Sequence, residues 1–314
     1  TSFDASELAA TIANTVFDAN TLEITSLNAV EVFINRITET VVNSRGLHKK
    51  QVRWTAMVEA IPTATADGES VELYGQCNFN ALDIDTLRAE IADKLSQSKA
   101  RFDAKRMDVT GTPKVILHAQ ELKELFWNFA DDLDYPSVYS HHNVYKKGDA
   151  IQTVPAGDLI GITMCAALPG CASSRCFDVD GLTLGEIRII ESGKAVAYHG
   201  SNRFGQYLQE QPTGVLPCIR LDPGTAEDTE FAAGPYLEIL SMSGIQTDFY
   251  SDYVGGEIRL ANFHDGETIR PVTGISISGS LKQVLSSIRL SSEASVHDAY
   301  NGPSKAILQN MKIF

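Results

Sequence analysis

Residues 115–139 read VILHAQELKELFWNFADDLDYPSVY, and this stretch decides the expected fold because a buried strand and an amphipathic helix follow one another in it. The apolar run at residues 115–117 comes after a glycine and a proline, which is typical of a buried strand. The helix pattern then has the helical period, so its apolar side chains form one stripe that must pack against a core. The stripe consists of Leu122, Leu125, Phe126, Phe129 and Leu133. Trp127, Asn128 and Asp131 lie off it.

The segment before this stretch predicts an α+β unit that ends near Val109. A helix pattern at residues 6–17 and a long strand at residues 30–42 come first. Strand patterns then lie on either side of Asp67-Gly68, a pair that tolerates the positive φ of a tight hairpin turn. Asp85 is expected to cap the next helix, which runs to Phe102.

The segment after residues 115–139 has a mainly β pattern. Hairpins are expected around Ser192-Gly193 and Asp265-Gly266. Ser280 is expected to cap a short helix that closes the open side of a sheet. The passage at residues 200–224 is rich in glycine and proline, so it predicts loops, either around a cleft or as plain connections.

Three of these segments together resemble a known family. Residues 115–139 are similar to the core strand and helix of the TldD/PmbA proteins, which are often labelled modulators of DNA gyrase, and residues 41–46, VVNSRG, resemble a turn of that family. Residues 241–290 carry the longest match: SMSGIQTDFYSDYVGGEIRLANFHDGETIRPVTGISISGSLKQVLSSIRL. This tail is the most specific signal, because it preserves the order of several strands, a turn and a helix. The resemblance covers roughly residues 27–314 and is loosest over residues 160–211.

One paralogue of that family carries His-Glu-x-x-x-His on the helix. In the present chain the first His falls on Trp127, the Glu on Asn128 and the second His on Asp132. A zinc peptidase needs imidazole ligands with an open coordination position, and a carboxylate that takes a proton from the bound water. An indole has no lone pair to give, an amide is no base at neutral pH, and one carboxylate is a weak ligand. The three positions therefore predict no zinc site, no cofactor and no catalytic residue.

The metal-bearing paralogue also uses a cysteine near its C-terminus, whereas the matching stretch here, HDAYNGPSK at residues 297–305, has none. The resemblance therefore implies the PmbA-like branch that lacks the metal motif. That branch is implied to act in a system that degrades or processes unfolded peptides, as a homodimer or as a heterodimer with a metal-bearing paralogue, and to be inactive alone. Trp127 then either fills the hollow that zinc would occupy or anchors a partner subunit.

The expected fold class is α+β. Residues 1–109 are expected to form an α+β domain that resembles the family's second domain, and residues 110–314 a mainly antiparallel sheet or barrel with packed helices that resembles its metalloprotease-like domain. Family members usually begin with a further α/β segment. That first domain is expected to be absent here, in a chain that is either naturally short or a fragment.

Composition limits the classes of partner. The chain has 314 residues and a formal charge of −14, from 40 acidic and 26 basic residues, and such a field repels the phosphates that nucleic-acid binders must neutralise. No apolar run approaches the ~20 residues of a membrane-spanning helix, and the N-terminal residues lack the pattern of a signal peptide. The sequence predicts a cytoplasmic protein without a nucleic-acid or membrane partner. Its five cysteines are expected to be reduced.

The remaining reactive residues suggest two other functions. Cys165, Cys171 and Cys176 are spaced unlike zinc knuckles and are expected to be buried or loop thiols. His141 and His142 follow several aspartates, but adjacent histidines in an extended segment point to opposite faces. A stand-alone hydrolase could use these histidines, Cys171 or the aspartates near residue 132. The other alternative is a non-catalytic homodimeric binding or scaffold protein.

Overall fold

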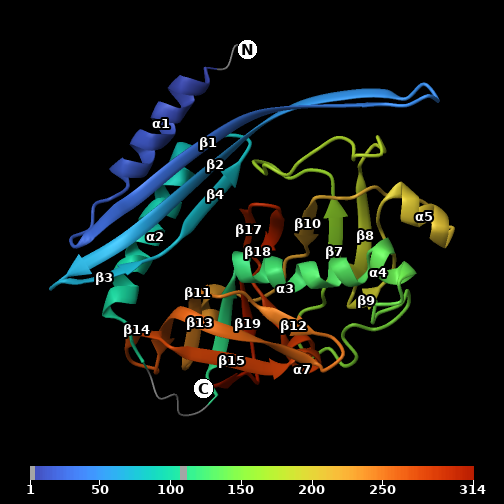
Figure 1. The fold of residues 1–314 in the computed structure, drawn as a ribbon. Helices are drawn as coiled ribbons and strands as arrows, with labels where there is room; N and C mark the ends of the chain where they lie inside the picture. Colours follow the sequence, from blue (N-terminus) through green and yellow to red (C-terminus); the bar gives the residue numbers. More distant parts are fainter. Residues whose placement is uncertain (1–3, 107–111) are drawn as a thin grey trace.

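The N-terminal unit consists of a twisted antiparallel sheet with two helices packed on it (Figure 1). A computed structural model describes residues 4–106 and 112–314 of the chain. Strands pair in the order β1-β2-β3, and β4 pairs with β2 beside β3. The elements are α1 (Ala5–Asp18), β1 (Thr25–Val42), β2 (His48–Ala66), β3 (Glu69–Glu72), β4 (Gly75–Phe79) and α2 (Ile84–Asp103).

Strands β1 and β2 form a hairpin whose far half reaches out as an arm over the other part of the molecule (Figure 1). The expected turn at residues 41–46 lies at the tip of this arm, where the side chain of Asn43 accepts hydrogen bonds from the backbone N–H groups of Arg45 and Leu47. Asp67 and Gly68 form the β2–β3 turn with φ of 51° and 84°, as predicted. The N-cap of α2 was predicted wrongly. Asp83, not Asp85, accepts the capping bonds, because the helix begins one residue before Asp85.

The remaining residues form two sheets with helices around them. The first elements are β5 (Lys105–Arg106), β6 (Lys114–His118), α3 (Ala119–Asp132), α4 (Tyr135–Tyr139), β7 (Ile162–Cys165), β8 (Glu186–Glu191), β9 (Lys194–Ala195), α5 (Asn202–Leu208), β10 (Cys218–Leu221) and α6 (Asp228–Ala232). They are followed by β11 (Tyr236–Met242), β12 (Gln246–Asp248), β13 (Tyr253–His264), β14 (Ile269–Thr273), β15 (Ile275–Ser280), α7 (Leu281–Ser287), β16 (Arg289–Leu290), β17 (Ala294–His297), β18 (Tyr300–Pro303), β19 (Lys305–Leu308) and β20 (Lys312–Ile313). The passage at residues 200–224 is not all loop, because it contains α5 and β10.

Strand pairing is mainly antiparallel, and the fold class is α+β as predicted. The larger sheet runs β16-β19-β6-β11-β13-β14-β5, and the smaller one runs β17-β18-β10-β7-β8-β9. Parallel pairs join β6 to β11, β10 to β18 and β5 to β14. Over the described residues, both sheets are open, so the alternative of a barrel is wrong. Both expected hairpins are present, with β8 paired to β9 and β13 paired to β14.

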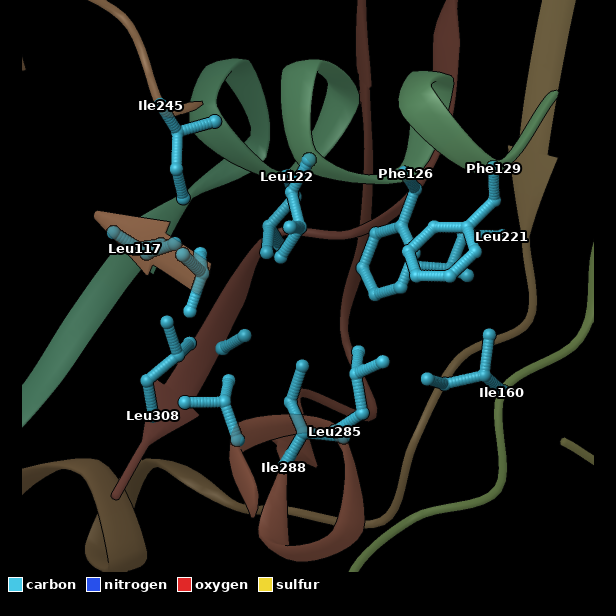
Figure 2. Packing of buried hydrophobic residues seen from close by; sticks show 14 of the residues in the cluster. Leu117, Leu122, Phe126, Phe129, Ile160, Leu221, Ile245, Leu285, Ile288 and Leu308 are labelled. Atoms are coloured by element: carbon cyan, nitrogen blue, oxygen red, sulfur yellow. The ribbon is translucent and has the colours of Figure 1, made fainter. Parts of the chain in front are cut away.

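Helix α3 lies over the main core and directs its apolar stripe into it. Figure 2 shows Leu122, Phe126 and Phe129 pointing from α3 toward the side chains of Leu285 and Ile288 in and after α7. All five stripe residues predicted from the sequence are buried. Ser280 caps α7 by accepting a hydrogen bond from the backbone N–H of Gln283, as expected. The strand and helix of residues 115–139 therefore form the centre of this part of the fold.

Two separate hydrophobic clusters underlie the two units. One is built from residues of α1, α2, β2 and β4, and the other contains only residues that follow Lys114. The predicted boundary between residues 109 and 110 lies outside the described residues. In the described part of the chain, none of the helices is both long enough and apolar enough to cross a membrane.

Candidate functional site

The three positions that match the lost metal motif lie on α3, but their side chains have separate partners. Trp127 is half-buried and packs between the main core and a small cluster that contains Cys165, Cys171 and Cys218. The Nδ2 of Asn128 donates a 2.7 Å hydrogen bond to the backbone carbonyl of Glu124, one turn earlier in the same helix. These two residues therefore stabilise the helix and its packing rather than facing a common centre.

Asp132 is buried, with an exposed fraction of 7%. Its two carboxylate oxygens accept hydrogen bonds of 2.7 and 2.9 Å from the backbone N–H groups of Val144 and Tyr145. Burial raises the pKa of Asp132, and the two N–H donors oppose that rise because they stabilise the charged form. The carboxylate thus holds the loop that follows α4 against the end of α3.

The other reactive side chains near α3 are dispersed. His141 and His142 are exposed in the loop after α4, and the Asp134 carboxylate caps α4 through the N–H of Ser137. Asp131 is exposed and hydrogen-bonded to the side chain of Trp127. Among residues 4–106 and 112–314, no group of three or more His, Cys, Asp or Glu side chains has an arrangement that could hold a metal ion.

Three of the five cysteines meet beneath Trp127, although they are far apart in sequence. Cys165 and Cys218 are cross-strand partners in β7 and β10, and Cys171 lies in the loop that follows β7. The Sγ atoms of Cys171 and Cys218 are 3.6 Å apart. Cys176, which was grouped with Cys165 and Cys171 in the sequence, is exposed and does not belong to this cluster.

A cleft of about 1000 Å³ lies between the two units, beside the first turn of α3. Strand β4 and helix α2 line it on one side, and α3 and β17 line it on the other. Within the described residues, β4 pairs only with β2 and β17 only with β18, so each strand has an outer edge that pairs with no other strand. The Oγ of Ser295 in β17 is buried without a hydrogen-bond partner and belongs to a residue that lines the cleft.

The charged residues of the cleft are mainly acidic. The acidic ones are Asp83, Glu90, Asp93, Glu121, Glu124 and Asp298, against Lys94 and Lys123. Burial raises the pKa of Glu121, whose exposed fraction is 4%, and burial lowers the pKa of His297. Lys123 pairs with Asp298 at 2.6 Å, so Lys94 is the one remaining lysine of the lining beside five carboxylates.

Sequence reasoning missed this cleft because its walls come from segments that are distant in the chain. Glu121 lies next to the apolar stripe of α3, where an acidic residue in a first helical turn is common and gives no sign of burial. His297 lies in residues 297–305, whose sequence is distinctive only in lacking a cysteine. The free edges of β4 and β17 follow from pairing that no local pattern reveals.

Comparison with known proteins gives a family match and a fold match. The family model for the PmbA/TldA metallopeptidase C-terminal domain matches residues 110–313. No curated protein matches significantly. TldE from Thermococcus kodakarensis superposes with a TM-score of 0.83 at 12% identity, over 99% of this chain and 75% of that one. A protein from Thermotoga maritima MSB8, named as a candidate modulator of a DNA gyrase, gives a TM-score of 0.79 at 16% identity, over 99% of this chain and 75% of that one. A protein of the same description from Bacteroides thetaiotaomicron VPI-5482 gives a TM-score of 0.78 at 12% identity, over 99% of this chain and 72% of that one.

Proposed function

This chain belongs to the TldD/PmbA family, and we propose that it is the non-metal member of a cytoplasmic peptidase system, in which it binds unfolded peptide and does not cleave it alone. In this proposal it acts as a homodimer or beside a metal-bearing paralogue. The observation that best supports this proposal is that the side chains of Trp127, Asn128 and Asp132 each contact a different part of the fold. Restoring one ligand would therefore not create a common metal centre.

The cleft supports the peptide-binding part of the proposal. An extended peptide can add to the free edge of a strand through backbone hydrogen bonds, which gives affinity without demanding a particular sequence. Residues of β4 and β17 line the same cleft, and each of these strands has one edge without a partner strand among the described residues. The surplus of carboxylates favours peptides with positive charge and disfavours nucleic acid.

We also propose that residues 1–109 and 110–314 are two domains, with β5 of the first pairing with β14 of the second. The two hydrophobic clusters support this division, because the first contains no residue after Leu95 and the second none before Val115. The family match begins at residue 110. In this arrangement the cleft lies between the domains, so their relative position would govern access to it.

The test combines metal analysis with a peptidase assay. We expect purified protein to contain no stoichiometric zinc and to leave unstructured peptides intact with or without a chelator, while the same peptides bind to it in fluorescence anisotropy. Stoichiometric zinc together with chelator-sensitive hydrolysis would overturn the non-metal role and favour a stand-alone hydrolase.

The partner is tested separately. A paralogue with an intact His-Glu-x-x-x-His motif from the same cell is mixed with this protein at micromolar concentration and examined by size-exclusion chromatography. Co-elution with a gain of peptidase activity would support the heteromeric form. Separate elution, with this protein eluting as a dimer that binds peptide, would support the homodimeric form, and failure of either form to bind peptide would contradict the proposed function.

A further inference from the structure

The thiol cluster beneath Trp127 is placed where two parts of the fold meet. The cluster joins β7, β10 and the loop at residues 166–176, and all three of its sulfur-bearing residues are buried. That loop also contacts the N-terminal unit. The backbone N–H of Asn80 donates to the carbonyl of Gly170 at 2.9 Å, and the Nδ2 of Asn80 donates to the carbonyl of Cys171 at 2.7 Å. Arg53 from the hairpin arm donates to the carbonyl of Ala172 at 3.0 Å.

The loop also forms part of the cleft wall. Pro169 and Gly170 line the cleft, directly before Cys171 in the chain. Gly170 thus places the cleft next to the backbone of Cys171, whose side chain is buried. Any change in the position of Cys171 acts on the wall and on both contacts made by Asn80.

Two thiols of the cluster, Cys171 and Cys218, differ in acidity. The hydrogen bond from Cys218 stabilises a negative charge on Cys171 and lowers the pKa of Cys171. The contact of Cys218 with Cys165, its contact with Cys171 and burial together raise the pKa of Cys218. Because the thiolate is the reactive form, Cys171 is the nucleophile of the pair and Cys218 keeps its proton until a later step.

We propose that Cys171 and Cys218 are a redox-modification site, which forms a reversible disulfide on exposure to hydrogen peroxide. The Cys171 thiolate attacks one peroxide oxygen, the O–O bond breaks, and with one proton taken up the products are Cys171 sulfenic acid and water. The Cys218 sulfur then attacks the Cys171 sulfur, the S–O bond breaks, and the hydroxyl leaves as a second water with the Cys218 proton. Two thiols and one peroxide thus give one disulfide and two waters.

The disulfide would change the cleft wall through Cys171. An S–S bond is ~2.05 Å long, so the two sulfur atoms must approach each other from their separation of 3.6 Å. Cys218 is fixed in β10 between β7 and β18, whereas Cys171 lies in a loop, so the loop is the part that moves. This site does not depend on the proposed peptide-binding function, because its chemistry involves only the two thiols and the oxidant.

The experiment uses the full chain with Cys176→Ser, which removes the exposed thiol that could link two molecules. The chain has five cysteines, so this variant has four. The folded protein is treated with hydrogen peroxide, quenched with catalase, and unfolded with a thiol-blocking reagent. We expect the number of free thiols to fall from four to two, the mass measured before blocking to fall by two hydrogens, and dithiothreitol added before blocking to restore both. Peptide mapping should identify a Cys171–Cys218 link.

Two further variants identify the pair. Cys165→Ser should still form the link, whereas Cys171→Ser should keep all of its remaining thiols. Trp127 gives a second readout in a Trp54→Phe background, where it is the only tryptophan and packs on the cluster. Its fluorescence should fall on oxidation and recover on reduction. Unchanged thiol number, a Cys165–Cys218 link, or loss of two thiols in Cys171→Ser would each overturn the proposal.

Discussion

The carboxylate of Asp132 accepts a 2.7 Å hydrogen bond from the backbone N–H of Val144, across twelve residues of chain. Its other oxygen accepts a similar bond from the next residue, Tyr145. Asp132 occupies the position of the second histidine in the metal motif of a paralogue. In this chain that position has a structural role, since a buried carboxylate accepts hydrogen bonds from two backbone N–H groups that would otherwise bond to water.

The first prediction concerns this contact. Asp132→Ala should lower the free energy of unfolding by about 2–4 kcal/mol, because it leaves two backbone donors without an acceptor in a buried place. Urea denaturation measures the change. Asn128→Ala is the matched control on the same helix and should cost less than about 1 kcal/mol, since its side chain bonds only to its own helix. Equal losses in the two variants would contradict the structural role of Asp132.

The second prediction concerns the complete motif. The triple variant Trp127→His, Asn128→Glu and Asp132→His should bind no stoichiometric zinc, and it should be less stable than Asp132→Ala alone. Trp127 is lost from between two apolar clusters, and the backbone donors near Asp132 lose their acceptor. Elemental analysis after dialysis measures the bound zinc, and urea denaturation measures the stability. Trp127→Phe, which keeps most of the packing, is the control. One zinc per chain in a folded triple variant would refute the prediction.

The third prediction concerns pH. Burial raises the pKa of Glu121 above its ordinary value of 4.5, so the folded state binds this proton more tightly than the unfolded state does. Stability contributed at this position is therefore present below pH 4.5 and is lost as the pH rises through the higher pKa of the folded protein. Glu121→Gln should be more stable than the wild type at pH 7, and the difference should vanish toward pH 4. Thermal denaturation across this range gives the difference, and equal stability of the two proteins at pH 7 would count against it.

The sequence revealed those parts of the fold that depend on local pattern. The stripe from Leu122 to Leu133, the turn at Asp67-Gly68 and the cap at Ser280 each follow from side-chain periodicity, permitted φ or a nearby donor, and the structure confirms all three. The predicted start of α2 was wrong because two candidate caps, Asp83 and Asp85, lie two residues apart. Only the geometry of the hydrogen bonds distinguishes them.

The candidate site could be predicted only in part, because its parts meet through long-range pairing. Cys218 joins Cys165 because β10 pairs with β7, yet β10 lies in a passage whose glycines and prolines predicted loops. The motif positions on α3 could be named from the sequence. Their separate partners, Asp132 with Val144 and Trp127 with the thiols, required the tertiary structure.

The fourth prediction concerns the contact between the hairpin arm and the rest of the molecule. Gln51 is nearly buried, and its Oε1 accepts a 2.8 Å hydrogen bond from the backbone N–H of Cys176. Gln51→Ala should cost about 1–3 kcal/mol and should speed hydrogen exchange of the Cys176 amide, because this donor loses its acceptor. Exchange measured by mass spectrometry on the 172–180 region is the readout. Lys50→Ala, at an exposed position on the same strand, should leave that exchange unchanged.

The fifth prediction concerns the acidic cleft and tests the charge of the peptide that it binds. A lysine-rich extended peptide should bind more tightly than a glutamate-rich one of equal length, and its affinity should fall as salt rises, because the cleft charges are only partly shielded from solvent. The double variant Glu90→Gln with Asp93→Asn should weaken binding of the lysine-rich peptide by about threefold or more, since each exposed pair contributes a few tenths of a kcal/mol to 1 kcal/mol. Glu7→Gln with Asp18→Asn changes the net charge equally on exposed positions of α1, outside the cleft, and is the matched control. Equal weakening in the two double variants would show that net charge alone attracts the peptide, and the cleft would then have no part in its recognition.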